Sequence, residues 1–368
     1  MSKKQKIIVA LVAALIAFAV VYSFAQRNSL RKKRASQVMT ENHQNQGVSE
    51  SNVLNNDNVS PITGLPCDNW NRRPIAVMQP SDFAARPASG FSEADMVIEM
   101  PVITATITRL MGVYICNNPE SVGSMRSARH DFVSLAKGMD AIFVHWGRSH
   151  MDWFIEKLDN GIIDNINCND DAGKSAGRYC FRHPDLVGMH SGYMKFDKIL
   201  EAANDFGYRL ETDFEGYPHK SESSLEERPQ GGNLRVAYAG NSAVEYDYDR
   251  ETNSYIRTWG GVLDKDRNNN EKIAPKNVVV AMAKSEQIEG QYNNVELGDP
   301  WMDTLDSGEA YYYMDGKEYR GNWKKDKSSV GSKLTFYDKN GEEIKFVPGQ
   351  VWVNILEPGQ RLRWTPVN

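Results

Sequence analysis

Hydrophobic residues follow three different patterns along the chain. Residues 7–25 are apolar and carry no charge, and their number is close to the roughly 20 residues that a helix needs to cross a bilayer. Residues 26–60 are polar, and from residue 35 they contain no aromatic side chain, so they cannot bury enough surface to fold. From Pro61 onward, short apolar runs alternate with turn residues. We predict a cytoplasmic tail over residues 1–6, a transmembrane anchor or signal over 7–25, a flexible stalk over 26–60 and then a folded body.

The first part of the body, residues 61–215, has the pattern of a mixed α/β domain. Apolar runs with the length and β-branched content of strands cover residues 75–79, 94–100, 106–116 and 141–146. Helices are expected from Ser124 to Lys137 with Ser124 as N-cap, over residues 150–160, and over residues 193–206 with Ser191 as N-cap. Gly138 and Gly207 follow the first and last of these helices, where glycine commonly ends a helix.

The second part of the body has a different pattern. Residues 216–233 are polar and interrupted by proline and glycine, and we interpret them as a linker. Beyond them, residues 234–368 contain many short runs of valine and aromatic residues, which predict strands. Asp315-Gly316 and Asn340-Gly341 are strong hairpin signals. We therefore predict a mainly antiparallel β second domain, and an α+β class for the protein as a whole.

Charge is unevenly distributed along the chain. The formal net charge is -5, yet the first 34 residues contain eight basic residues and no acidic ones, so the folded body is clearly acidic. A protein that binds nucleic acid needs a broad basic surface to displace counterions from phosphates. Nucleic acid is therefore excluded as the main partner, and any arginine cluster in the body must be local.

The flanking charges do not settle the side of the membrane on which the body lies. Basic residues on both sides of residues 7–25, taken by the positive-inside rule, favour a cytoplasmic body. A cleaved signal peptide competes with an anchor because Ser23 and Ala25 have the small-residue spacing that signal peptidase accepts. The signal-like start and an even number of cysteines favour an oxidising compartment. We expect a single-pass cell-membrane protein with an extracytoplasmic body.

The four cysteines are better interpreted as disulfides than as nucleophiles. Cys168 and Cys180 bracket a polar loop that a disulfide would close, which leaves Cys67 and Cys116 as the other pair. Four cysteines allow three connectivities, so this pairing is one of three.

The stretch GSMRSARHDF, Gly123 to Phe132, has basic residues where a helix is expected to begin. The first turn of a helix carries about half a positive charge, so Arg126 and Arg129 there require a negative group nearby. One interpretation is an anion site, in which guanidinium groups and helix amides converge on a carboxylate or phosphate. The other is an internal network in which the arginines pair with Asp95 or Glu99.

Histidines are a second group of candidates. His145 ends an apolar strand, and α/β proteins place their sites at the carboxyl ends of strands; His190 precedes a predicted helix. With Asp95 or Glu99 as partner, either histidine could carry out acid-base catalysis. No zinc, phosphate-loop or dinucleotide motif is present, and residues 264–270 match only half of a calcium loop. Neither a metal nor a cofactor is predicted.

The motifs occur in a familiar order. NRRPIAVM, ARPASGFSEADMVIE, ITRL, GSMRSARHDFVSLAKGMDAIFVHWG and MHSGYMKFDKI are followed by APKNVVV, SGEAYYYMDGKEYRGNWKK and TFYDKNGEEIKFVPGQVWVNIL. This series resembles the YerB-like bacterial lipoprotein family, a domain-of-unknown-function family, over nearly the whole body. The resemblance implies a membrane-tethered envelope protein with an α/β first domain and a β-rich second domain. Family members carry a lipid-modified cysteine after the signal, whereas the first cysteine here is Cys67.

The resemblance also implies a set of polar positions that overlaps the candidates above. They are Arg86, Ser89, Asp95, Glu99, Arg109, Arg126, Ser127, Arg129, His145 and His190.

Three hypotheses for the function follow. In the leading one, the first domain binds an anionic ligand, such as a cell-wall polymer or peptide carboxylate, through Arg86, Arg109, Arg126, Ser127 and Arg129. In the second, the protein is a hydrolase or transferase acting on cell-wall material, with Asp95, Glu99, His145 and His190 as acid-base candidates. In the third, it is a scaffold for wall-synthesis proteins that uses exposed aromatic residues of the β domain, Tyr311 to Tyr313.

Overall fold

The computed structural model describes residues 58–103, 107–169, 176–238, 242–289, 292–302 and 304–367. The predicted tail, the apolar segment 7–25 and nearly all of the predicted stalk lie outside these residues. None of the helices within them has the length and apolar character needed to span a bilayer. Residues 58–60, which the stalk prediction included, belong to the fold: Val59 pairs with Pro66, and Ser60 is buried.

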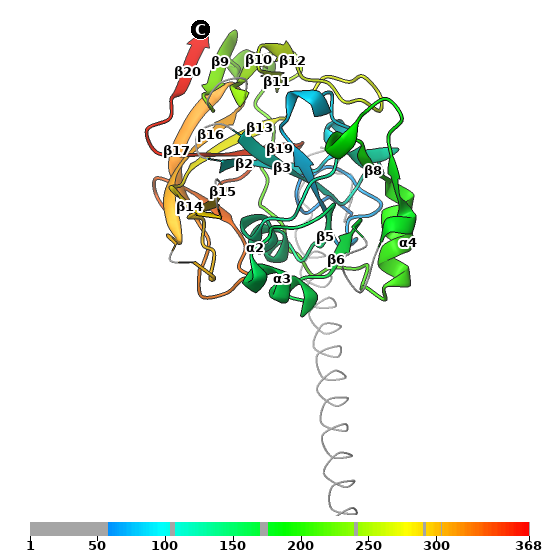
Figure 1. The fold of residues 1–368 in the computed structure, drawn as a ribbon. Helices are drawn as coiled ribbons and strands as arrows, with labels where there is room; N and C mark the ends of the chain where they lie inside the picture. The colour runs from blue at the N-terminus through cyan, green and yellow to red at the C-terminus, as the bar shows by residue number, and fades with distance from the viewer. Residues whose placement is uncertain are drawn as a thin grey trace, which may run out of the picture. The chain divides into compact units, whose positions relative to one another are not determined.

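A large mixed sheet forms the centre of the fold (Figure 1). Among the described residues it contains twelve strands, ten of them in the order β18-β17-β16-β13-β19-β2-β3-β1-β5-β6, with β14 and β15 off this path. Their bounds are β1 Ile75–Pro80, β2 Met96–Ile103, β3 Ile107–Tyr114, β5 Ile142–His145, β6 Asn165–Asn167, β13 Asn277–Met282, β14 Ser285–Glu289, β15 Tyr292–Val295, β16 Ser307–Met314, β17 Lys317–Lys324, β18 Thr335–Asp338 and β19 Val351–Leu356. The four strands predicted in the first half are thus confirmed as β1, β2, β3 and β5.

The two halves of the body share this sheet. Strand β19 lies between β13 and β2 and runs parallel to both, so a strand from the second half pairs directly with one from the first. Every residue of β19 is buried, as is typical of a strand covered on both faces. The expectation of antiparallel pairing in the second half is therefore wrong for β19, because its continuous apolar run suits the interior of a parallel sheet rather than a half-exposed hairpin.

A second sheet does have the antiparallel pairing that was predicted. It contains β9 Gly231–Val236, β10 Val244–Asp249, β11 Ser254–Trp259, β12 Val262–Leu263 and β20 Leu362–Val367. In β10, buried Val244, Tyr246 and Tyr248 alternate with more exposed residues, so one face packs and the other meets solvent. A small third sheet contains β4 Ser121–Gly123, β7 Cys180–Arg182 and β8 Gly192–Lys195.

Helices cover part of the large sheet. Among the described residues the α-helices are α2 His130–Gly138, α3 Asp152–Asp159 and α4 Phe196–Asp205, and the 3-10 helices are η1 Phe83–Ala85, η2 Phe91–Glu93, η3 Gly177–Tyr179, η4 Gly188–His190 and η5 Leu225–Glu227. Apolar residues of α2 and α3 share one core with one face of the sheet, and Figure 1 draws these two helices side by side. Residues of α4 and of the second sheet share another core with the opposite face.

Two predicted helix starts are wrong. Helix α2 begins at His130 rather than after Ser124, because residues 125–128 run extended and give their backbone groups to neighbouring strands. Arg126 N–H donates to the carbonyl of Met78, and the Arg126 carbonyl accepts from Trp146 N–H. Helix α4 begins at Phe196 with Lys195 as N-cap, because the residues after Ser191 form β8.

The predicted turns and disulfides are confirmed. Asp315 and Gly316 both have positive φ, 53° and 70°, and connect β16 to β17 as a tight hairpin. Disulfides join Cys67 to Cys116 and Cys168 to Cys180. All four cysteines of the chain are used in these two bonds.

Candidate functional site

The predicted arginines lie at one edge of the large sheet. Strands β13, β19, β2, β1, β5 and β6 run in the same direction, with β3 antiparallel between β2 and β1, so their carboxyl ends share an edge. The extended segment 125–128 crosses this edge, hydrogen-bonded to Met78 of β1 and to Gly147 just after β5. The edge where open α/β sheets bind their ligands is thus lined by the segment that carries Arg126 and Ser127.

Among Arg109, Arg126 and Arg129, Arg126 has the most accessible side chain. Its Nη2 lies 2.9 Å from Oδ2 of Asp82, and its side chain is 14% exposed. Its Nε is buried and makes no hydrogen bond within the described part of the chain. A buried N–H without a partner is costly, so this guanidinium has capacity for another acceptor.

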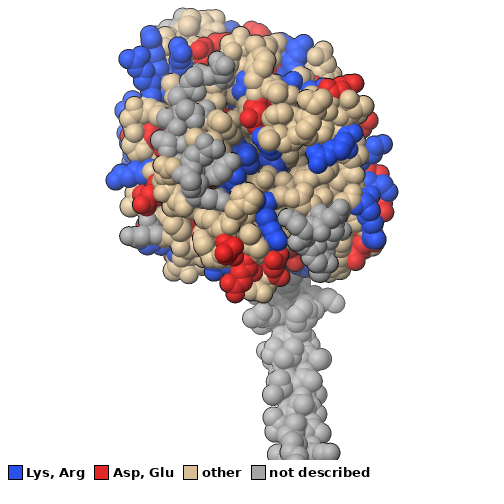
Figure 2. All heavy atoms as spheres, in the orientation of Figure 1, with Lys and Arg blue, Asp and Glu red and all other residues tan. Residues whose placement is uncertain are grey.

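Arg109, Ser127 and Arg129 surround the same segment. Arg109 lies at the start of β3, and its Nη1 donates to the carbonyl of Ser127 at 3.2 Å. The Nη1 of Arg129 donates to the carbonyl of Ala128 at 3.3 Å. Both arginines are buried, whereas Ser127 is half-buried. Figure 2, in the same orientation as Figure 1, shows lysine and arginine side chains near a hollow in the middle of the face turned toward the viewer.

Arg86 belongs to a different cluster. Its guanidinium lies 3.4 Å from the ring centroid of Trp259, and its Nη2 donates to the carbonyl of Ser81. Burial lowers the pKa of Arg86 to about 10, helped by the nearby charge of Arg257. Arg257 is fully buried and lies 4.5 Å from the ring centroids of both Trp259 and Trp352. The stack of arginines and tryptophans is a structural core that sequence reasoning missed.

Glu99 is the acidic partner of this core. Its Oε2 lies 2.7 Å from Nη2 of Arg257, and its Oε1 accepts a hydrogen bond of 2.7 Å from Thr108. Asp264 pairs with the other Nη of Arg257. Of the negative groups considered for Arg126, Glu99 is therefore not its partner, because Glu99 pairs with Arg257 and Arg126 pairs with Asp82.

Asp95 also has partners other than the predicted arginines. Its carboxylate accepts hydrogen bonds from Ser60 Oγ at 2.8 Å and from the N–H groups of Ile115 and Cys116 at 2.7 and 3.2 Å. Burial raises the pKa of Asp95, although these hydrogen bonds oppose the shift. Asp95 connects Ser60, near the start of the fold, to the residues that follow β3, and it is not the partner of Arg126 that the internal-network interpretation allowed.

The two candidate histidines lie apart from these acids. His145, at the end of β5, is buried; its Nδ1 lies 2.7 Å from the carbonyl of Gly147 and its Nε2 lies 3.1 Å from Oδ1 of Asn165. His190 ends the 3-10 helix η4 and is half-buried. Ser89, which the family resemblance also named, is buried and pairs with Gly123 through its backbone.

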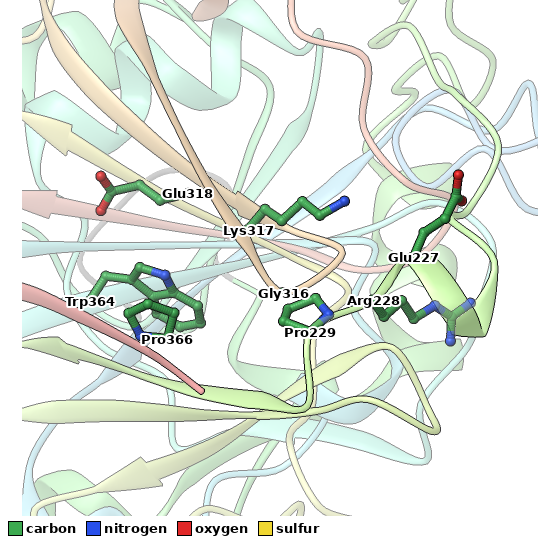
Figure 3. A pocket seen from close by; sticks show the side chains of 8 residues that line it. All are labelled: Glu227, Arg228, Pro229, Gly316, Lys317, Glu318, Trp364 and Pro366. Atoms are coloured by element: carbon green, nitrogen blue, oxygen red, sulfur yellow. The ribbon is translucent and has the colours of Figure 1, made fainter. Parts of the chain in front are cut away.

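A groove in the second half of the body was not predicted as a site (Figure 3). It has a volume of about 440 Å³ and is lined by Glu227, Arg228, Pro229, Gly316, Lys317, Glu318, Trp364 and Pro366. A second hollow of about 360 Å³, which shares Glu318 and Trp364 with the first, includes Tyr311. Of the three tyrosines proposed for a docking surface, Tyr311 thus borders a hollow, whereas Tyr312 and Tyr313 are buried.

Trp364 forms the centre of this groove. The indole lies against Gly232, where an added Cβ would come within 2.2 Å of the ring. Figure 3 shows Pro366 beside Trp364 and the Lys317 side chain extending toward Glu227. A half-buried tryptophan in the polar, alternating strand β20 is the sequence signal that could have indicated this surface.

The described residues thus form a two-part body whose halves share one mixed sheet. The family described as "Protein of unknown function (DUF3048)" matches with its N-terminal domain over residues 62–209 and with its C-terminal domain over residues 234–353. The chain therefore belongs to this family, and the resemblance deduced from the sequence motifs is confirmed.

Two comparisons link the chain to a relative from Bacillus subtilis (strain 168). A protein named "Putative lipoprotein YerB" is 32% identical over 302 residues, which cover 81% of this chain and 86% of the relative. The crystal structure of the YerB protein from Bacillus subtilis matches with a TM-score of 0.69 and 31% identity, covering 81% of this chain and 96% of that one. Fold and family are shared, and neither printed name states a ligand or an activity.

Proposed function

We propose that the protein is an extracytoplasmic, membrane-anchored envelope protein that binds an anionic ligand at the carboxyl edge of its large sheet. The ligand is a phosphate or carboxylate group of a cell-wall polymer or peptide. Arg126 is its first contact, and Arg109, Ser127 and Arg129 complete the site.

The single observation that carries this proposal is the environment of Arg126. Its guanidinium reaches solvent, has only the half-exposed Asp82 as its described ionic partner, and retains a buried Nε without a hydrogen bond. A planar guanidinium offers paired donors that match the oxygens of a carboxylate or phosphate.

The location rests on the relative and on the sequence. The relative's name describes a lipoprotein, which is anchored outside the cytoplasm. In this chain all four cysteines form disulfides, so we assign the anchoring to the apolar segment 7–25. Disulfide bonds persist in oxidising compartments, which agrees with a body outside the cytoplasm.

The test is a binding titration with Arg126→Gln. Inorganic phosphate and a wall peptide with a free carboxylate serve as the two probes, and Arg320→Gln, which removes an exposed arginine from the opposite half, serves as the matched control. Charge-assisted hydrogen bonds are worth about 1.5–3 kcal/mol, so we expect Arg126→Gln to weaken binding about 10- to 100-fold. Equal affinities in wild type and both variants would refute the site.

The groove around Trp364 favours a second candidate function, the binding of a neutral saccharide chain. The ring of Trp364, with Pro366 beside it, offers an apolar surface for sugar rings, and exposed Lys317 offers a hydrogen-bond donor. Titration with a wall glycan oligomer would test it: Trp364→Ala should abolish binding, whereas Arg126→Gln should not. The scaffold hypothesis for wall-synthesis proteins would use the same surface.

The hydrolase or transferase hypothesis stays a prediction. Asp95 and Glu99 are committed to buried structural contacts, which leaves His190 as the most accessible of its four candidates. Incubation of purified wall fragments with wild-type protein and with His190→Ala tests it directly. Product formed by wild type and lost in the variant would support catalysis; no product from either would exclude it for these fragments.

A further inference from the structure

A buried cluster of one histidine and two carboxylates lies beside the proposed anion site. His130 and Asp131 form the first turn of α2, and Asp299 comes from the second half of the chain. Nε2 of His130 lies 2.5 Å from Oδ1 of Asp131 and 3.4 Å from Oδ2 of Asp299. One ligand atom from each residue lies within 4.8 Å of the others, and all three residues are at most 4% exposed.

One oxygen of each carboxylate accepts a hydrogen bond from a backbone amide. Oδ2 of Asp131 accepts a hydrogen bond of 3.2 Å from Val295 N–H, and Oδ1 of Asp299 accepts one of 2.9 Å from Trp301 N–H. The second oxygen of each carboxylate is therefore the one that faces His130. Outer hydrogen bonds of this kind orient ligands in metal sites.

Within the described residues, the two inward oxygens contact Nε2 of His130 but accept no hydrogen bond of suitable geometry. Oδ1 of Asp131 and Oδ2 of Asp299 are both buried without a hydrogen-bond partner within the described residues. Buried carboxylates require a compensating cation. Besides His130, the charged group that acts on Asp299 is Lys325, which is also buried and donates to Ser332 Oγ at 2.9 Å. The amino group of Lys325 forms its hydrogen bond with Ser332, and no ion pair joins it to Asp131 or Asp299 within the described residues. A cation between the three inward atoms would compensate both carboxylates.

We propose that this cluster binds a divalent transition metal, Zn²⁺ or Mn²⁺, through Nε2 of His130, Oδ1 of Asp131 and Oδ2 of Asp299. Imidazole together with two carboxylates suits such ions better than Mg²⁺ or Ca²⁺, which prefer oxygen ligands alone. Metal bonds of about 2.0–2.2 Å hold neighbouring ligand atoms about 3 Å apart, so Asp131 Oδ1 moves slightly outward when the ion enters. Water completes the coordination.

The metal would connect the two halves of the chain at the N-terminal turn of α2. The histidine ring packs edge-on against Trp153, and Trp153 packs against Trp301, which follows Asp299 by two residues. An ion held by residues from both halves would therefore stabilise the whole fold, and the two tryptophans would report its arrival through their fluorescence.

The experiment uses the full chain in detergent, treated with chelator and then supplied with Zn²⁺, Mn²⁺, Mg²⁺ or Ca²⁺. Thermal unfolding should shift upward by about 5 °C with Zn²⁺ or Mn²⁺ at a hundredfold excess over the dissociation constant, and not with Mg²⁺ or Ca²⁺. Asp299→Asn and His130→Gln should abolish the shift. His183 and the exposed Asp185, 4.0 Å apart, provide the control variants His183→Gln and Asp185→Asn, which should retain the shift.

Co²⁺ gives a second measurement that does not depend on stability. Its visible absorption bands should appear with wild type and with the control variants, and should be lost in Asp299→Asn. A wild type that shows neither a metal-specific shift nor these bands, or an Asp299→Asn protein that shows both, would overturn the proposal. Should Asp299→Asn fail to fold, the wild-type bands and their loss in His130→Gln decide the question.

Discussion

Arg126 and Arg257 are both paired with acidic residues, yet their environments are opposite. Arg257 is fully buried between two tryptophan rings and contacts Glu99 and Asp264, which are buried as well. Arg126 keeps 14% of its side chain exposed, and its partner Asp82 is 28% exposed. Arginine–carboxylate pairs thus form a buried structural core around Arg257 and an accessible edge at Arg126. The difference in burial distinguishes the structural role from the proposed binding role.

The largest effect is expected from breaking the sealed core. Arg257→Met would leave the carboxylates of Glu99 and Asp264 buried without their cation. Removing one partner of a buried ion pair costs about 3–5 kcal/mol, so the free energy of unfolding should fall by this amount. Urea denaturation followed by tryptophan fluorescence measures it. A loss below about 1 kcal/mol would mean that this core is not sealed as described.

Arg126 should respond in the opposite way. Arg126→Gln leaves Asp82 half-exposed, so we expect a loss of only about 0–1 kcal/mol of unfolding free energy in the same denaturation experiment. Ligand affinity, in contrast, should fall as described for the anion site. Strong destabilisation of Arg126→Gln would show that Arg126, like Arg257, mainly stabilises the fold.

A smaller effect concerns pH and the buried acid Asp95. Burial raises its pKa in the folded state, so the folded protein holds a proton at pH values where the unfolded chain, with an ordinary pKa near 3.9, has lost it. This contribution to stability is present at low pH and is lost as the pH rises above about 4 through the raised pKa. Denaturation midpoints of wild type and Asp95→Asn are measured across this pH range. The midpoint of wild type should fall as the pH rises, and the variant should lack the part of this fall that Asp95 causes. If the midpoints of wild type and variant changed with pH in the same way, Asp95 would not titrate as described.

The smallest effect is expected at the exposed pair of Arg320 and Glu318. The arginine side chain is 68% exposed, and solvent screens surface pairs of this kind so that they contribute little to stability. Arg320→Gln should therefore leave both the unfolding free energy and the anion affinity nearly unchanged. A large change in the unfolding free energy or in the anion affinity would mean that Arg320→Gln cannot serve as a control.

The sequence predicted local structure better than distant pairing. The apolar runs located β1, β2, β3 and β5, and the Asp315-Gly316 pair located a hairpin, because these signals depend on neighbours in the chain. Glu99 could not be assigned to Arg257, which is 158 positions away, since nothing near either residue records the contact.

The site was predicted only in part for the same reason. The arginines of GSMRSARHDF do lie at a strand edge, but the helix expected after Ser124 begins at His130, because the segment pairs with β1 and β5 instead. His130 and Asp131 lie next to Arg129 and were passed over, since their partner Asp299 comes from the other half of the chain. Trp364 was missed because one tryptophan in a polar strand carries no motif.

The most direct test of the central claim is to locate a bound anion. Crystals of the protein soaked in selenate allow the oxyanion to be placed from the anomalous signal of selenium. We expect selenate within hydrogen-bonding distance of the Arg126 guanidinium, at the edge crossed by residues 125–128, with Arg257 still enclosed by Glu99 and Asp264. Selenate bound only at other basic side chains, with Arg126 still engaged by Asp82 alone, would contradict it.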